Sequence, residues 1–265
     1  MDLKLNGLNA LITGASKGLG FATAKELLKE GANVVINSRS KENLSIAKER
    51  LENLSRPSQK LHTISGDVTK ESACLKIIEK SQSLLGGLDI LITNSGGPPA
   101  GGFESLNFDQ WDQAIDLSFK SHLYLIKYAL PFLKNSSYPS VLAITSFTIK
   151  YPLDNLILSN SIRAATAALI KSLSIELGNE GIRFNSILPG WTLTDRVENL
   201  LAMRAEKNET SISSERDGIT TSIPLSRMGK PNEFARAATF LVSPAASYIT
   251  GVFLTVDGGI SRGLF

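Results

Sequence analysis

Residues 13–20 read Thr13-Gly14-Ala15-Ser16-Lys17-Gly18-Leu19-Gly20, and this stretch decides how the chain can fold. It lies between the apolar segment Leu8–Thr13 and the amphipathic segment Leu19–Glu30, so it predicts a turn from a buried strand into a helix. Glycines at such a turn let the backbone approach a pyrophosphate closely, and the first amides of the helix donate hydrogen bonds to it. The spacing is G-x-x-x-G-x-G rather than the more common G-x-G-x-x-G, so the turn alone also fits an ordinary glycine-rich connection.

The same alternation of short apolar and longer amphipathic segments continues along the chain. Segments rich in Val, Ile and Leu predict strands buried on both faces at Leu8–Thr13, Asn33–Asn37, Leu61–Ile64, Leu88–Thr93, Ser140–Thr145, Arg183–Leu188 and Val252–Val256. Amphipathic segments predict helices at Leu19–Glu30, Lys41–Leu54, Ser72–Leu85, Phe108–Leu133, Asn155–Leu177 and Asn232–Leu241. This alternation predicts one α/β domain over residues 1–265, with helices on both faces of a parallel sheet. A polar, helix-compatible insertion at about 195–222 predicts a lid at the carboxyl edge of the sheet.

The composition narrows the class of protein. Hydrophobic residues make up 42% and charged residues 20%, and 28 basic against 25 acidic residues leave a net charge of +3 without a basic cluster, so no nucleic-acid partner is expected. Cys74 is the only cysteine, and Met1–Leu5 lacks the apolar segment of a signal peptide, so the cytoplasm is the expected location. No apolar segment approaches membrane-spanning length, and no Cys/His/Asp cluster has metal-ligand spacing. His62 and His122 are predicted to be structural.

Further motifs accompany the glycine turn in a fixed order: Gly66-Asp67-Val68, Asn94-Ser95-Gly96-Gly97, Gly181-Ile182-Arg183-Phe184-Asn185, Pro189-Gly190, and Tyr248-Ile249-Thr250-Gly251 with Asp257-Gly258-Gly259. With these motifs the chain resembles the short-chain dehydrogenase/reductase superfamily over nearly its whole length, in its 3-oxoacyl-ACP-reductase-like part. The resemblance implies a single Rossmann-type, doubly wound domain whose seven-stranded parallel sheet has the order 3-2-1-4-5-6-7. It also implies an oxidoreductase that binds a nicotinamide dinucleotide.

The resemblance assigns the residues of the cofactor site. The turn would hold the pyrophosphate with Gly14, Ser16, Lys17, Gly18, Leu19 and Gly20. Asp67 and Val68 would border the adenine, and Asn94, Ser95 and Gly96 the adenosine ribose. The nicotinamide would be flanked by Pro189, Gly190, Thr192 and Thr194, with Trp191 as a pocket residue. Asn94 and Asn185 also fit as amides that stabilise turns.

The residues after the second predicted strand indicate which cofactor is preferred. An NAD enzyme usually carries an acid there, which accepts hydrogen bonds from the ribose 2′-hydroxyl, whereas this chain reads Asn37-Ser38-Arg39-Ser40. A carboxylate would repel a 2′-phosphate, but Arg39 can bind one with a bidentate fork, and Lys17 adds a second positive charge. The sequence therefore predicts NADP(H) rather than NAD(H).

The catalytic residues depart from the family pattern. The family transfers hydride at C4 of the nicotinamide and uses a serine, a tyrosine thirteen residues later, a lysine four residues further on, and an asparagine on the preceding helix. Ser146 matches the serine, but the other positions are occupied by Ser159, Arg163 and Ser118. The chain is therefore similar to a minority branch without the Tyr-x-x-x-Lys pair, which includes the reductase of bacilysin biosynthesis.

These replacements leave the source of the proton open. A serine hydroxyl is a far weaker acid than a phenol, and Arg163 can donate to the ribose hydroxyls but does not titrate. Lys150, four residues after Ser146, is expected at the carboxyl end of the fifth strand. Beside a bound substrate and the positive nicotinamide its pKa would fall, so Lys150 is a candidate acid, although it also fits as a surface lysine. The candidate catalytic residues are Ser146, Lys150, Ser159 and Arg163, with water as the other proton source.

Two functions fit this pattern. One is an NADP(H)-dependent reductase, or the reverse dehydrogenase, acting on a small-molecule carbonyl or alcohol substrate. The other is a catalytically impaired NADP(H)-binding protein that serves as a sensor or an assembly subunit. The resemblance also implies a homotetramer or homodimer; small residues on the helix after Ser159 (Ala164, Ala165, Ala167 and Ala168) allow close helix approach, although a core-facing stripe would look alike.

Overall fold

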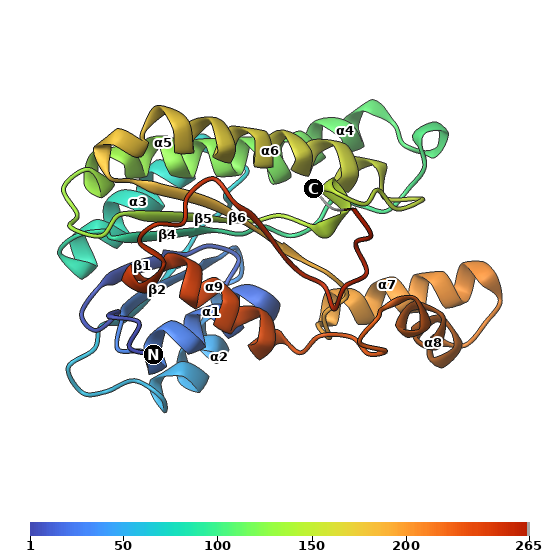
Figure 1. Ribbon diagram of the computed structural model, residues 1–265, viewed down its shortest axis with the longest axis horizontal. Helices are drawn as coiled ribbons and strands as arrows, with labels where there is room; N and C mark the ends of the chain where they lie inside the picture. The colour runs from blue at the N-terminus through green and yellow to red at the C-terminus, as the bar shows by residue number, and fades with distance from the viewer. Residues whose placement is uncertain (264–265) are drawn as a thin grey trace.

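A parallel sheet in the order β3-β2-β1-β4-β5-β6-β7 organises the chain (Figure 1), and the computed structural model describes residues 1–263. The strands are β1 Asn9–Ile12, β2 Asn33–Ser38, β3 Leu61–Ser65, β4 Ile90–Thr93, β5 Ser140–Ile144, β6 Arg183–Pro189 and β7 Phe253–Val256. The α-helices are α1 Gly18–Lys29, α2 Lys41–Glu52, α3 Glu71–Leu85, α4 Phe108–Ile115, α5 Ser121–Leu133, α6 Ile157–Glu176, α7 Asp195–Asn208, α8 Ile212–Ser222 and α9 Pro231–Val242. The predicted strand order and Rossmann-type architecture are confirmed.

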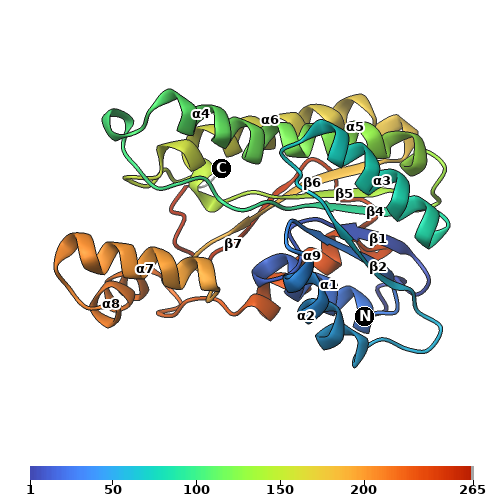
Figure 2. The same ribbon diagram turned by 180° about the vertical axis from the view of Figure 1, so that it is seen from behind.

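Successive residues of β1 enter two different hydrophobic cores, as expected for a strand buried on both faces. Ala10 and Ile12 pack with α1, α2 and α9, whereas Leu11 packs with α3, α5 and α6. Figures 1 and 2 show these two helical layers on opposite sides of the sheet. The prediction that this strand is buried on both faces is therefore confirmed residue by residue.

The segment 108–133, which we predicted as one helix, is divided. Between α4 and α5 lies a single π-helical turn, η2, at Asp116–Lys120. A π turn adds about one residue to one turn of the helix. The apolar stripe resumes on α5 after this insertion, so the hydrophobic period does not reveal it. Ser118, which takes the position of the family's asparagine, is buried in this turn.

The polar insertion at 195–222 forms α7 and α8, which lie against each other beside the carboxyl edge of the sheet (Figures 1 and 2). A hydrophobic cluster, in which Val197, Leu201 and Ile219 pack with Trp191 and with Leu188 of β6, joins them to the sheet. The helical structure agrees with the sequence pattern, and the movement of this region as a lid is still a prediction. Within residues 1–263, no helix is long and apolar enough to cross a membrane.

Candidate functional site

A cleft of about 820 Å³ opens at the carboxyl edge of the sheet. It is lined by the glycine turn, the loop after β4, the end of β5, the first part of α6 and the start of α7. Most residues predicted for the site line it: Gly14, Lys17, Gly18, Leu19, Asn94, Ser95, Gly96, Ser146, Ser159, Arg163, Pro189, Gly190, Thr192 and Thr194. Trp191, which we predicted as a pocket residue, also lines it. The carboxyl edge of the sheet thus gathers residues that are far apart in the sequence.

The glycine turn requires glycine for two different reasons, close packing at Gly14 and backbone angle at Gly18. A Cβ atom at Gly14 would lie 2.8 Å from the carbonyl oxygen of Asn94, so no larger residue fits there. Gly18 has a φ angle of +59°, which favours glycine, and a Cβ atom there would meet nothing closer than the Thr194 methyl group at 3.7 Å. At Gly18, therefore, the backbone angle rather than crowding favours glycine.

The amino-terminal end of α1 fits a pyrophosphate. Its N-cap residue, Lys17, makes no side-chain cap, and its first turn carries no acid. By contrast, Ser40 caps α2 by accepting from the amide of Asn43, and Thr194 accepts from the amide of Val197 at the start of α7. The first amides of a helix need acceptors, and the positive end of the helix dipole favours an anion. The α1 terminus, with Gly18 and Leu19 on the cleft, thus meets the requirements of a phosphate group.

Asn94 connects the glycine turn to β4. Its amide nitrogen Nδ2 donates to the carbonyl of Gly14 at 3.0 Å, and its backbone exchanges hydrogen bonds with the hydroxyl of Thr13 at 2.7 and 2.9 Å. Asn185, on β6, similarly donates to Ile249 and accepts from the amide of Val252. Both amides therefore stabilise turns, as one of the two interpretations predicts.

Three hydroxyl groups form a chain at the end of β5. The Oγ atom of Ser146 accepts from the hydroxyl of Thr148 at 3.0 Å and from its backbone amide at 3.2 Å. The Thr148 hydroxyl lies 3.3 Å from the Oγ atom of Ser159. Sequence analysis missed Thr148, because neither periodicity nor spacing indicates that the short helix η3 (Phe147–Ile149) turns this side chain back toward Ser146 and Ser159. The arrangement can hold and orient an oxygen atom in the cleft.

Arg163 is buried next to these three hydroxyl groups. It donates to the carbonyl of Thr145 at 2.6 Å and, more weakly at 3.4 Å, to the carbonyls of Ile144 and Gly96. Burial, together with the positive charge of the nearby Arg196, lowers the pKa of Arg163 to about 10. The guanidinium group is therefore still charged at neutral pH, and it lines the cleft.

His122, on α5, lies behind the same region. Its Nδ1 atom is 2.7 Å from the hydroxyl of Thr93 at the end of β4. Burial, together with the positive charge of Arg163, lowers the pKa of His122 to about 3. The imidazole is neutral at physiological pH and acts as a hydrogen-bonded core residue, in agreement with a structural role.

The structure does not bring every predicted residue to the cleft. Lys150 is exposed and lies outside the lining of the cleft, on the turn that follows η3. Arg39 is also exposed, directly after β2 at the same sheet edge. The carboxylate of Asp67 accepts from the amide and hydroxyl of Thr69, both at 3.0 Å. Ser16, Gly20 and Val68 likewise lie outside the lining, near the turns that follow β1 and β3.

Arg196 is a second residue that sequence analysis missed. From the first turn of α7 it donates to the carbonyls of Gly97 and Pro98, both at 3.2 Å. A Cβ atom at Gly97 would overlap the Arg196 guanidinium, so only glycine allows this close approach. These contacts join the start of the predicted lid to the loop after β4 at the mouth of the cleft.

Comparison with known proteins agrees with this geometry. The family model described as Enoyl-(Acyl carrier protein) reductase matches residues 14–261. The NADPH-dependent reductase BacG of Bacillus subtilis (strain 168) is 30% identical over 255 residues, which cover 96% of this chain and 98% of BacG. The crystal structure of YwfH, an NADPH-dependent reductase involved in bacilysin biosynthesis, has a TM-score of 0.91 at 29% identity and covers 97% of this chain and 99% of its own.

An NADPH-bound short-chain oxidoreductase from Pseudomonas aeruginosa PAO1, described as containing an atypical catalytic centre, has a TM-score of 0.87 at 29% identity and covers 96% of both chains. The predicted similarity to the bacilysin-pathway reductase is confirmed. The chain belongs to the short-chain dehydrogenase/reductase family.

Proposed function

We propose that this protein is an NADP(H)-dependent oxidoreductase that interconverts a small-molecule carbonyl and the corresponding alcohol. One observation supports this most directly: the uncapped amino end of α1 and the hydroxyl group of Ser146 lie on the same cleft. Bound NADPH would supply the hydride. The glycine turn and α1 would hold its pyrophosphate, Arg163 its nicotinamide ribose, and Pro189 to Thr194 the face of its nicotinamide.

The preference for NADP(H) rests on positive charge without a competing carboxylate. Arg39 follows β2 where NAD enzymes place an acid, and Lys17 is exposed on the cleft. The relatives described as NADPH-dependent or NADPH-bound support the same assignment. We expect NADPH to bind more tightly than NADH in calorimetric titrations, and Arg39→Asp to reverse the order. Equal or tighter binding of NADH by the wild type would contradict the assignment.

Ser146 polarises the substrate carbonyl, and Thr148 and Ser159 fix the direction of its hydroxyl. Water supplies the proton along these hydroxyl groups, since Lys150 lies outside the lining of the cleft. A positioned proton donor contributes about 10²- to 10⁴-fold to turnover. We therefore expect Ser146→Ala to lower kcat by about that factor, and Lys150→Met to leave kcat nearly unchanged. If Lys150→Met loses turnover while its NADPH affinity is unchanged, Lys150 is the acid, and the loop after η3 must turn inward when substrate binds.

A cofactor-binding protein without catalysis is the second candidate. It is favoured by one observation, that no tyrosine is present among the described residues that line the cleft. A screen of NADPH oxidation against ketones, aldehydes, enones and sugars separates the two functions. Turnover with any of these classes supports the enzyme, whereas tight NADPH binding with no turnover on any of them supports the binding protein.

The surface of α6 supports self-association. Of the small residues predicted to allow close approach, Ala165 and Ala168 are exposed while Ala167 is buried. The exposed pair continues toward Ile175, which is 75% exposed. We propose a homodimer or homotetramer that uses this face of α6. Light scattering at micromolar concentration should give a multiple of 28.6 kDa, and a monomer would contradict the proposal.

We also propose a lid and a cellular location. Residues 195–222 would act as a lid, with Arg196 holding the start of α7 to the loop after β4. Hydrogen exchange in α7 and α8 should slow when NADPH and substrate bind, and unchanged exchange would contradict a lid. A cytoplasmic location is suggested by the single, buried cysteine, Cys74, which excludes an internal disulfide.

A further inference from the structure

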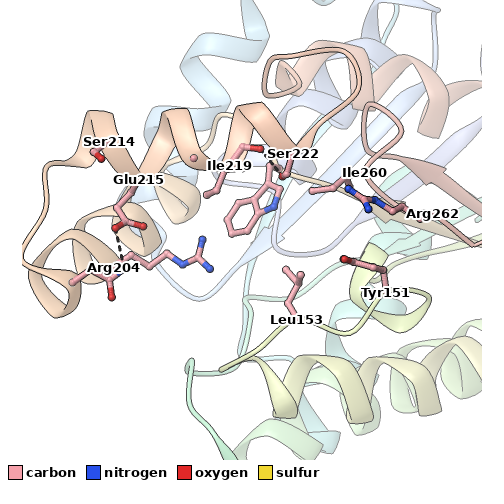
Figure 3. Close-up of a pocket in the computed structure, with 12 residues that line it drawn as sticks. Tyr151, Leu153, Arg204, Ser214, Glu215, Ile219, Ser222, Ile260 and Arg262 are labelled. Atoms are coloured by element: carbon pink, nitrogen blue, oxygen red, sulfur yellow. Dashed lines mark hydrogen bonds between the residues drawn. The ribbon is translucent and has the colours of Figure 1, made fainter.

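A second cavity, of about 450 Å³, lies beside the cleft (Figure 3). Its walls come from α7, α8, the loop after η3 and the segment after β7. It shares Leu153 and Trp191 with the cleft, so the two spaces meet at these side chains. These two side chains therefore border two adjoining spaces, and a substrate that occupied both would have to pass Trp191.

The cavity is lined by two arginines. Arg204 comes from α7 and Arg262 from the segment after β7, and both are exposed. Figure 3 shows both guanidinium groups and the Tyr151 hydroxyl directed toward the middle of the cavity. The Arg204 guanidinium carbon lies 5.4 Å from the ring centre of Trp191, within cation–π distance. This contact holds the Arg204 side chain at the junction between cavity and cleft.

Neither arginine forms a salt bridge within residues 1–263. Among the described lining residues, Glu215 alone carries a carboxylate, and that group already has other partners. Its Oε1 atom accepts from Asn208 at 2.9 Å and from Thr210 at 2.7 Å, and these bonds, with the charge of Arg204, hold the pKa of Glu215 below its usual range. With two cations and one anion, the lining has a net charge of +1. It favours an oxyanion over a neutral group.

We infer that this cavity binds an anionic group, a carboxylate or a phosphate, at the end of the substrate away from its carbonyl. The inference rests on the proposed function, since it specifies the substrate class of the same reductase. A guanidinium group binds a carboxylate or phosphate through charge-assisted, bidentate hydrogen bonds, and the Tyr151 hydroxyl can donate another. With a neutral substrate, Glu215 would be the only carboxylate among the described lining residues to offset the two arginines.

Matched carbonyl substrates test the inference. One set comprises straight-chain oxo acids of increasing length and their methyl esters, and the other comprises dihydroxyacetone phosphate and dihydroxyacetone. We expect kcat/KM with NADPH to be at least about tenfold higher for an anion than for its neutral partner, since hydrogen bonds to charged groups contribute about 1.5–3 kcal/mol. The set with the larger ratio identifies the anion as a carboxylate or a phosphate. Equal kcat/KM values in both sets would overturn the inference while leaving the reductase function intact.

Variants locate the effect in the cavity. Arg204→Met and Arg262→Met should each lower kcat/KM for the preferred anion by about 10- to 100-fold and change it little for the neutral partner. Arg216→Met is the matched control, because Arg216 lies on α8 outside this lining and bonds to Glu198 at 2.8 Å. If the anion preference survives in both cavity variants, the anion binds elsewhere and the inference is wrong.

A binding measurement separates this inference from the proposed function. The chain has two tryptophans, so Trp111→Phe leaves Trp191 as the only one, and its fluorescence reports on the junction. In the NADP⁺ complex we expect the oxo acid or phosphate ester to change this fluorescence at concentrations where the neutral partner does not. The change should disappear in Arg204→Met. Anion binding without NADPH oxidation would overturn the reductase and retain the subsite, whereas the absence of anion binding would overturn the subsite.

Discussion

Two arginines lie at opposite edges of the same sheet. Arg183 begins β6 at the amino edge, and its guanidinium donates at 2.7–3.3 Å to four carbonyl groups, those of Leu241, Val242, Ser243 and Ile249. Arg163 lies at the carboxyl edge and makes one short bond, to Thr145 at 2.6 Å, with two longer bonds of 3.4 Å to Ile144 and Gly96. Burial lowers the pKa of both to about 10, so both are charged at neutral pH.

The two regions differ in what surrounds each guanidinium group: protein carbonyl groups surround that of Arg183, whereas that of Arg163 borders the cleft. The Arg183 guanidinium donates to carbonyl groups at the end of α9. It therefore caps this helix and connects it to β6. Arg163 faces a cleft of about 820 Å³ and makes three bonds to the protein, two of which are long at 3.4 Å. An equal pKa therefore does not indicate an equal role, because Arg163 has room for the oxygen atoms of a ligand.

The largest expected effect is at Arg183. Arg183→Met should lower the free energy of unfolding by about 3 kcal/mol, because the carbonyl groups at the end of α9 lose their donors in a partly buried place. NADPH affinity should be unchanged in the folded fraction. Urea denaturation measures the change, with Arg236→Met as control, since Arg236 on α9 is largely exposed and its nearest carboxylate, on Glu26, is 3.8 Å away. If both variants have the same stability, Arg183 does not stabilise the amino edge.

The next largest effect concerns pH at the carboxyl edge. Because the pKa of His122 is lowered from 6.5 to about 3 in the folded protein, the unfolded chain binds an additional proton between these values. The contribution of His122 to the free energy of unfolding is therefore fully present above pH 6.5. It falls as the pH decreases, by about 2 kcal/mol at pH 5. Urea denaturation at pH 7.5 and pH 5 should show this loss, and His122→Asn should reduce it.

His62 provides the control for this experiment, because it is half-exposed and does not line the cleft, although partial burial with the charges of Lys48 and Lys60 lowers its pKa in the same direction. His62→Asn should keep most of the pH dependence of the wild type. If His122→Asn and His62→Asn change the pH dependence equally, then the acid sensitivity of the carboxyl edge does not come from His122.

The smallest expected effect is at Arg163. Arg163→Met should weaken NADPH binding by about tenfold, which is about 1.4 kcal/mol, because the ribose loses a charged donor. The free energy of unfolding should fall by only about 1 kcal/mol, since only one short hydrogen bond is lost. Calorimetry and urea denaturation measure the two quantities. If Arg163→Met loses more stability than Arg183→Met and keeps full NADPH affinity, the contrast between the two edges is wrong.

Most of the fold can be predicted from the sequence because the signals for strands and helices are local. The ends of the strands lie within two residues of the predicted ends, since buried parallel strands have continuous apolar runs bounded by polar or glycine residues. The helix 108–133 was the exception, because the π turn η2 does not disturb the apolar stripe. Asn94 was predicted only in part. Its motif predicted its place on the cleft, but its hydrogen bonds to Thr13 and Gly14 appear only in the structure.

The site was harder to predict where a residue's role depends on the direction in which its side chain points. Lys150 and Thr148 both follow Ser146 within four residues, and the sequence pointed only to the lysine, as a candidate acid that also fits as a surface residue. The turn of η3 directs Thr148 toward Ser146 and Ser159 and leaves Lys150 exposed. Arg196 carries no recognisable motif, and its contact depends on the absence of a side chain at Gly97, almost one hundred residues earlier.

By itself, the sequence determined the alternation of strands and helices, the glycine turn and, through its family motifs, the residues around the cofactor. These features depend on short-range periodicity and on turns that only certain residues can make. Only the tertiary structure decided which polar side chains share the cleft and that Arg204 and Arg262 line one cavity. Such groupings depend on how loops and helices from distant segments pack together, and no local pattern records that packing.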